Sequence, residues 1–529
     1  MKKILNNPEY IDFLTKQLED NNITRSVKAL CKEYDLTYSD QMRRSFSKKL
    51  QSLGVIESTS IEESKEYHEA TNRKIKKSKY YLVSWAQAQT EVHKPFLENM
   101  EAYAAHLGAE IAISAGRYKN PVSIERSARV VDSEKNKNTW DSCIHEYLYA
   151  SKLELAPKLT VLANVKVQPT AVKPLSGLNG FTSDSSVILP HPKVQLESLP
   201  ILDGYKHKLM LSTGAVTMPN YTDTKAGRKG EFHHQMGFVV VEIDKDNSFH
   251  VRQVQADDEG NFFDLFTEVR DGVVLEGKGE YSVVFGDLHI GSHCTESVSL
   301  ACDIANRVEA KNVILHDVLD SKSINHHEEK NPFLLLEKEE SGEDNLEEEL
   351  EYTLLELKAL TKRVKTATFH NIASNHNDFL DRWLRDVDWR KVRNKKMYLE
   401  LANIVAKGKA PKGVFNYLVS DRIGDRVNTY AYGDSLRIKN WELALHGDYG
   451  ANGSRGGVNQ FKNLSTKTIT GHTHSPRRED GSIIVGTLTK LRIGYNTGLS
   501  SWMNGVVLIY PNGKATNIHF INNKYTIQS

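Results

Sequence analysis

The chain has 529 residues, 39% of them hydrophobic and 26% charged, with a formal net charge of +1. This length indicates about two to four domains of ~100–200 residues each, and the near-neutral charge limits any nucleic-acid surface to a local patch. Apolar runs such as Gly237–Val241 are too short for a membrane span of ~20 residues, and four cysteines without a C-x-x-C motif favour a reducing, cytoplasmic setting.

Residues 1–55 are expected to form a small domain of three short helices. Pro8 can open the first helix, and Ser39 can cap the third. One side of the third helix is basic and carries Arg43, Arg44, Lys48 and Lys49. Such a unit suits a helix-turn-helix that contacts DNA. It suits equally well a bundle that docks on the rest of the protein or on another subunit.

Residues 56–79 segregate acidic from basic side chains and are expected to be a charged linker. Residues 80–275 then alternate strand and helix, which predicts an α/β domain. Its first strand–helix–strand order, within residues 81–114, recurs within residues 281–315, which indicates a degenerate internal duplication. The first copy has alanine and glutamine where the second has an acid and a histidine. We therefore expect binding or homo-oligomerisation there rather than catalysis.

Five short segments of the last half each follow a strand-like apolar run, and they carry most of the chain's chemistry. They are VVFGDLHIG at 283–291, VILHDVLD at 313–320, FHNIASNHND at 369–378, LALHGD at 443–448 and ITGHTH at 469–474. Strand periodicity places Asp287 and His289 on one side of the chain, and His472 and His474 likewise. Carboxylates, an amide and imidazoles at strand ends form a mixed ligand set suited to manganese, iron or zinc.

The order of these motifs resembles the calcineurin-like metallophosphoesterase superfamily, whose pattern is D-x-H, G-D-x-x-D, G-N-H-[DE], an isolated histidine and G-H-x-H. The resemblance covers residues 276–529. It implies a catalytic α/β (α+β) domain built as a two-sheet sandwich flanked by helices. It also implies two divalent metal ions, with Mn²⁺ preferred and Fe²⁺, Zn²⁺ or Mg²⁺ as alternatives.

The resemblance assigns roles to individual residues by matching motif. The first ion would be bound by Asp287, His289 and His474, the second by Asn375, His446 and His472, and Asp317 would bridge the two. His376 matches the catalytic histidine, which stabilises the transition state or protonates the leaving oxygen. Two positions depart from the pattern: His316 replaces the usual glycine, and Asn377 stands where an acidic residue is usual.

Other residues near the motifs are candidates for substrate binding. His326 and His327 follow the second motif, and Arg455 lies in a glycine-rich segment after His446. An arginine in such a segment can clamp a phosphate, although a plain surface loop explains the composition equally well.

Within the superfamily, the chain resembles the nuclease branch of the double-strand-break-repair exonuclease type, and the large early DNA-degrading nucleases of some tailed bacteriophages. This implies a DNA nuclease that uses a metal-activated water and degrades host DNA in the infected bacterial cytoplasm. The alternatives are a phosphatase or cyclic-nucleotide phosphodiesterase acting on small molecules or phosphoproteins, and a non-catalytic scaffold. The complete ligand set argues against the scaffold.

Overall fold

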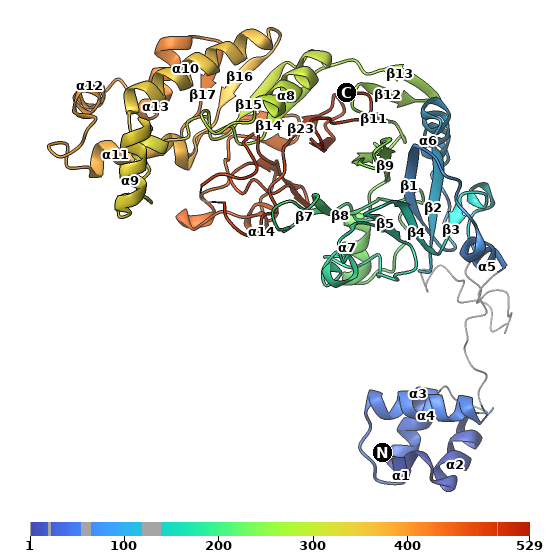
Figure 1. Ribbon diagram of the computed structural model, residues 1–529. Helices are drawn as coiled ribbons and strands as arrows, with labels where there is room; N and C mark the ends of the chain where they lie inside the picture. The colour runs from blue at the N-terminus through green and yellow to red at the C-terminus, as the bar shows by residue number, and fades with distance from the viewer. Residues whose placement is uncertain (1, 19–22, 54, 56–64, 119–138, 495) are drawn as a thin grey trace. The chain divides into compact units, whose positions relative to one another are not determined.

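The computed structural model describes residues 2–18, 23–53, 55, 65–118, 139–494 and 496–529 (Figure 1). The chain divides into a small unit within residues 1–64 and a large unit that begins at Lys65. None of the described helices combines the length and apolar character needed to cross a membrane.

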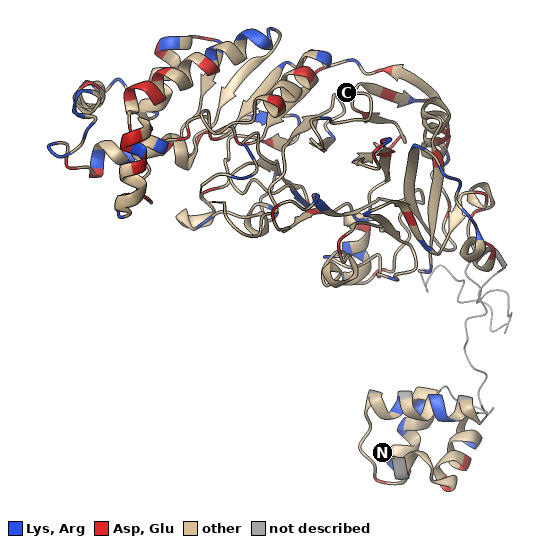
Figure 2. Ribbon diagram, viewed as in Figure 1, with Lys and Arg blue, Asp and Glu red and all other residues tan. Residues whose placement is uncertain are grey.

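The small unit is helical. Its described helices are α1 (Lys2–Leu5), α2 (Pro8–Leu18), α3 (Ile23–Glu33) and α4 (Asp40–Ser52). Leu14, Leu30 and Phe46 are fully buried in its core. The Ser39 hydroxyl accepts the Met42 backbone N–H at 3.1 Å, so it caps α4 as the sequence predicts. Basic residues lie along α3 and α4 (Figure 2).

Helix α5 (Lys65–Asn72) lies in the stretch that we expected to be a charged linker. Tyr67 and Ala70 are buried in the core of the large unit, and the Tyr67 ring stacks on Trp140 with centroids 6.0 Å apart. The prediction of a linker over residues 56–79 is therefore wrong for residues 65–72. Two buried side chains in this charged segment hold it on the large unit.

The first half of the large unit contains a five-stranded sheet in the order β10-β9-β1-β2-β3. Its strands are β1 (Tyr80–Gln87), β2 (Glu110–Gly116), β3 (Leu148–Tyr149), β9 (Gly237–Ile243) and β10 (Phe249–Gln255). The helices of this first half are α6 (Lys94–Leu107) and α7 (Lys225–His233). A small antiparallel sheet follows, made of β11 (Phe262–Asp264), β12 (Thr267–Arg270) and β13 (Val273–Glu276).

The second half contains a six-stranded sheet in the order β17-β16-β15-β14-β23-β24. Its strands are β14 (Ser282–Phe285), β15 (Asn312–Leu315), β16 (Thr368–Asn371), β17 (Val427–Thr429), β23 (Gly505–Ile509) and β24 (Ala515–His519). The helices of this half are α8 (Thr295–Arg307), α9 (Pro332–Ser341), α10 (Leu346–Arg363), α11 (Asn375–Asp386), α12 (Lys395–Ala406), α13 (Val414–Ile423) and α14 (Val458–Phe461).

A ten-stranded sheet runs through both halves in the order β18-β19-β20-β22-β21-β7-β8-β6-β5-β4. The first half supplies β4 (Lys152–Ala156), β5 (Leu159–Leu162), β6 (Ser186–Leu189), β7 (Leu196–Leu199) and β8 (Lys208–Ser212). The second half supplies β18 (Arg437–Ile438), β19 (Trp441–Glu442), β20 (Lys467–Thr470), β21 (Arg477–Glu479) and β22 (Ser482–Ile484). The halves join where β7 pairs antiparallel with β21. Residue 275 therefore does not separate two domains, because both sides of it share one sheet and one compact unit.

The two halves repeat one topology. In each, parallel strands β1-β2-β3 or β14-β15-β16 continue through two antiparallel strands, β9-β10 or β23-β24. In the ten-stranded sheet, the order and directions of β4-β5-β6-β8-β7 recur in β18-β19-β20-β22-β21. Matching backbone bonds support the correspondence: the His93 N–H donates to Val216 O, and the Cys294 N–H donates to Leu488 O.

Alternating side chains hold the layers of the second half together. Val283 and Phe285 on β14 face a core shared with α8, α10 and α13, whereas Val284 packs with Trp441 and Ile469 of the ten-stranded sheet. The six-stranded sheet therefore lies between helices and a second sheet, as the period of two along its strands dictates. The candidate site forms in the loops that follow the carboxyl ends of its strands.

Candidate metal centre

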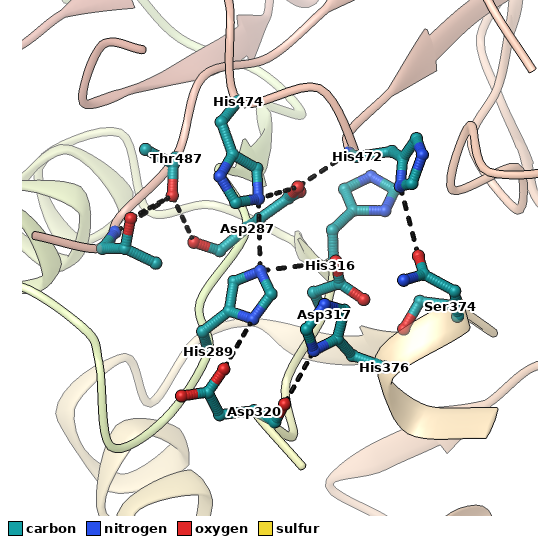
Figure 3. A network of polar contacts seen from close by, with 12 residues as sticks. Asp287, His289, His316, Asp317, Asp320, Ser374, His376, His472, His474 and Thr487 are labelled. Atoms are coloured by element: carbon teal, nitrogen blue, oxygen red, sulfur yellow. Dashed lines mark hydrogen bonds and ion pairs between the residues drawn. The ribbon is translucent and has the colours of Figure 1, made fainter. Parts of the chain in front are cut away.

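The carboxyl ends of β14, β15 and the strands around β20 bring predicted residues into one buried cluster (Figure 3). The His474 Nε2 atom lies 3.0 Å from Asp287 Oδ2 and 3.2 Å from His289 Nε2. His289 Nε2 also lies 3.4 Å from Asp317 Oδ2. The ligand atoms of these four residues all lie within 4.8 Å of one another. Four lone-pair donors that converge in a buried space suit a cation.

A second cluster shares Asp317 with the first. The His446 Nε2 atom lies 3.0 Å from Asp317 Oδ2, and Asp317, His446 and His472 form a group within 4.8 Å. The Asn375 side-chain oxygen lies 3.1 Å from His472 Nδ1. The structure thus gathers all seven predicted ligands into two groups, with Asp317 in a position to bridge them.

Several atoms of these clusters that could bind a metal ion are buried and have no hydrogen-bond partner. They are Asp287 Oδ1, Asp317 Oδ1, His446 Nε2 and His474 Nδ1. Buried polar atoms without partners are costly, and a bound ion removes that cost where it coordinates them. The residues present therefore fit a pair of divalent ions, and the ligand types do not distinguish manganese from iron or zinc.

The backbone of the site adopts an unusual conformation at four ligands. His289, Asp317, His472 and His474 have φ values of 43°, 44°, 71° and 58°. Residues with a side chain rarely adopt this left-handed region, and such strain concentrates at functional sites. Gly471 is required by space: a Cβ atom there would lie 2.1 Å from Asp287 Oδ1.

The aspartate and histidine side chains of the clusters shift the pKa values of one another. Burial raises the pKa of Asp317, but His446 and His376 outweigh it and hold the pKa well below its ordinary value. Burial lowers the pKa of His446, but the Asp317 carboxylate raises it to about 9. In the metal-free protein a proton on His446 therefore compensates part of the negative charge that a cation would otherwise balance.

His376 lies next to the first cluster, at the start of α11. Its Nδ1 contacts the Asp320 carbonyl oxygen at 2.7 Å, so Nδ1 carries the hydrogen and Nε2 remains for a substrate. Burial, followed by repulsion from His289, lowers the pKa of His376 to about 4. The His376 ring lies edge-on to the His289 ring, with centroids 4.3 Å apart.

Asp320 is a further residue of the candidate site, which the sequence-based assignment of ligands did not include. Its Oδ1 lies 3.1 Å from His289 Nδ1 (Figure 3). Its Oδ2 accepts the Ser292 hydroxyl at 2.6 Å. A carboxylate in this place orients a metal-binding histidine and raises its basicity. The signal was present in the sequence, because Asp320 is the second acid of the Asp317-x-x-Asp320 motif.

The candidate substrate-binding residues differ in their surroundings. His326 accepts a hydrogen bond from Arg382 at 2.9 Å and packs edge-on against Phe379, whose ring stacks on His376. His327 is exposed and lies against His326, with ring centroids 3.9 Å apart. Arg455 is exposed; its carbonyl oxygen accepts from the Gln460 side chain at 3.1 Å, and its neighbour Gly456 donates its N–H to Asp448 O.

The basic residues predicted to contact DNA lie on α4 of the small unit. Lys48 is exposed, and Arg43 and Lys49 are half-buried; the side chain of Arg44 lies outside the described residues. These side chains belong to the small unit, whereas the clusters belong to the large unit.

The corresponding positions of the first half lack ligands. After β6 the chain reads Pro190-His191-Pro192-Lys193, where β20 leads into Gly471-His472-Thr473-His474. His191 Nε2 contacts the Gln168 carbonyl at 3.1 Å, and Lys193 forms an ion pair with Asp480. Among the described residues, the groups that can hold a metal ion lie in the second half.

Two cavities border the start of α11. One, of about 370 Å³, is lined by Ser292, Asp320, His376 and Lys490 among others. The other, of about 400 Å³, is lined by residues that include Ser374, Asp378, Lys412 and Tyr432. His376 therefore borders the first cavity, and Ser374, the residue before the candidate ligand Asn375, borders the second.

Fold and site together define a mixed α/β protein with buried histidine–aspartate clusters that can bind a metal ion. No protein-family profile matches the chain. It is 30% identical over 473 residues, 85% of this chain and 83% of its relative, to a protein named Protein A1 of Escherichia phage T5. The chain therefore belongs to the family of this phage protein.

Proposed function

We propose that the chain is a metal-dependent DNA nuclease of the calcineurin-like metallophosphoesterase class, acting on host DNA in the cytoplasm of an infected bacterium. The observation that carries this proposal is the pair of buried clusters that share Asp317. Kinship with a phage protein supports the phage setting.

The residues of the centre have distinct tasks in the proposed reaction. Two bound divalent ions would lower the pKa of an attacking water and polarise the phosphoryl oxygens. Asp317 keeps the two ligand groups together, and Asp320 holds the His289 ring through Nδ1. His376 presents Nε2 toward substrate, and the negative charge of a phosphodiester there favours a protonated ring that donates to the leaving oxygen.

The two cavities support a polymer as substrate. A small phosphoester fills space on one side of a reacting phosphorus, whereas a nucleic-acid strand continues in both directions from it. The two cavities that border the α11 start give room for such a strand. Lys490, an exposed lysine in the lining of the first cavity, is suited to a neighbouring phosphate.

The test compares wild type with Asp317→Asn. With manganese, wild type is expected to degrade linear or circular DNA and to cleave a chromogenic phosphodiester. Asp317→Asn is expected to lose both activities and at least one metal equivalent, because Asp317 serves both clusters. Hydrolysis of a chromogenic phosphomonoester alone would overturn the nuclease proposal in favour of a phosphatase. Two full metal equivalents in the variant would contradict the bridging role.

A further inference from the structure

His316 lies behind the second cluster, directly before the shared ligand Asp317. Its side chain is completely buried. Its Nδ1 atom lies 3.4 Å from Nδ1 of His446, and the two rings are tilted by 36° with centroids 5.4 Å apart. Two imidazole nitrogens at this distance share a single hydrogen, since two N–H groups would repel and two lone pairs would gain nothing.

The other nitrogen of His446 decides which ring carries that hydrogen. His446 Nε2 faces the shared carboxylate, 3.0 Å from Asp317 Oδ2. A neutral histidine that binds a cation through Nε2 must carry its proton on Nδ1. The Nδ1–H of His446 then points at His316, which accepts it.

We propose that His316 is a positioning residue, which accepts the Nδ1–H of His446 and so fixes the tautomer and ring orientation in which His446 binds the second ion. The inference rests on the proposed metal centre. Carboxylates and backbone carbonyls usually take this part for metal-binding histidines. Here an imidazole takes it, at a position where the resembled superfamily usually has a glycine without any side-chain acceptor.

A purely space-filling role for His316 makes the opposite prediction for two substitutions. His316→Asn keeps an acceptor oxygen on the same side-chain carbon but loses volume. His316→Leu keeps more of the volume but removes the acceptor. If the hydrogen bond matters, asparagine is the better replacement; if packing matters, leucine is.

The experiment measures binding of Mn²⁺ to the metal-free full-length protein by titration calorimetry, with electron paramagnetic resonance to distinguish paired from single ions. We expect wild type and His316→Asn to bind two ions with affinities within about threefold of each other and to show the signal of a coupled pair. In His316→Leu the affinity for one ion should fall about 10–100-fold, the usual effect of losing such a partner. Single-ion signals should then predominate at low manganese.

His370 provides a matched control. It is also a buried histidine of the six-stranded sheet, but its ring contacts Tyr430 and Asn312 rather than a ligand. His370→Leu should leave both manganese affinities unchanged. Equal affinities in His316→Leu and wild type, or a larger loss in His316→Asn than in His316→Leu, would overturn the inference alone. Failure of wild type to take up any divalent ion would instead overturn the proposed function as well.

Discussion

At the scale of single residues, the centre depends on a few atoms whose space is fixed by the backbone. Asp287 illustrates this: its Oδ2 accepts the His472 backbone N–H at 2.7 Å, and its Oδ1 lies against Gly471. The glycine of the Gly-His-x-His motif is thus explained by the carboxylate that it accommodates. Substitution of Gly471 should weaken metal binding more than it lowers the stability of the fold.

Gly471→Ala is expected to displace the Asp287 carboxylate, because the new methyl group would lie 2.1 Å from Oδ1. We expect manganese binding at the first cluster to weaken and the hydrolysis rate of a chromogenic phosphodiester to fall at least ~10²-fold. Calorimetry and steady-state kinetics measure both effects. Gly180→Ala is the control, since nothing lies within 4 Å of its added Cβ. Unchanged metal binding in Gly471→Ala would contradict the placement of Asp287.

His446 predicts how metal-dependent stability changes with pH. Its pKa rises from 6.5 to about 9 in the metal-free fold. A raised folded-state pKa stabilises the protein fully below pH 6.5, and this contribution is lost as the pH rises through about 9. A metal ion must displace the same proton, so it binds more easily as the pH rises.

We therefore expect the gap in Tm between manganese-loaded and chelator-treated protein to widen from about pH 6.5 to about pH 8.5. Thermal unfolding under anaerobic conditions, which prevent manganese oxidation, measures this gap. His446→Asn should flatten the dependence. A gap that is constant with pH in the wild type would speak against the protonated His446–Asp317 pair.

At the scale of elements, the first residues of α11 combine the cap of the helix with two residues of the candidate site. Ser374 caps this helix by accepting the Asn377 backbone N–H, and the next two residues are the ligand Asn375 and the candidate catalytic His376. The Asn377 side chain accepts the Leu319 backbone N–H and donates to the Ile372 carbonyl. Asn377 therefore has a structural task in place of the acidic residue that the superfamily pattern contains.

Ser374→Ala is expected to reduce the free energy of unfolding by about 1 kcal/mol, the usual cost of losing an N-cap, and also to reduce kcat. The control is Asn345→Ala, which removes the N-cap of α10, where the Asn345 side chain accepts from Glu347 and Glu348. Both variants should lose similar stability in urea unfolding. An equal loss of kcat in both would show that the cap does not position the site.

Sequence patterns predict those elements that are determined by residues close to one another in the chain. Alternation and strand-end motifs indicated β14 and β15, and the repeated strand–helix–strand order indicated that the first half copies the second. The ten-stranded sheet could not be predicted, because β7 and β21 are short and pair across a long stretch of chain. The contact between His316 and His446 was equally inaccessible, since it depends on how two distant loops meet.

At the scale of the whole molecule, the shared sheet makes the stability of the second half dependent on the first. Arg477 and Arg478 of β21 pair with Glu197 and Leu196 of β7, and the Ser198 N–H donates to Pro476 O. Without β7, a strand edge and apolar surface would be exposed, which promotes aggregation. The small helical unit, by contrast, has its own core.

A fragment of residues 276–529 is therefore expected to aggregate, whereas a fragment of residues 65–529 should stay monodisperse and cleave a chromogenic phosphodiester. Size-exclusion chromatography and circular dichroism distinguish the two. If the basic face of α4 contacts DNA, the longer fragment should also bind DNA more weakly than the full chain, with unchanged turnover of the small substrate. A soluble, folded 276–529 fragment would refute the dependence on the first half.

The continuous sheet also restricts how a long substrate can enter. Strands that hydrogen-bond across the boundary between the halves leave no hinge there. The two halves therefore cannot move apart and then close around a polymer. For the proposed nuclease, admission would instead depend on surface loops, such as the glycine-rich residues 450–457, where the Gly456 N–H donates to the Asp448 carbonyl. Catalytic readiness would then be built into the resting molecule rather than produced by domain closure.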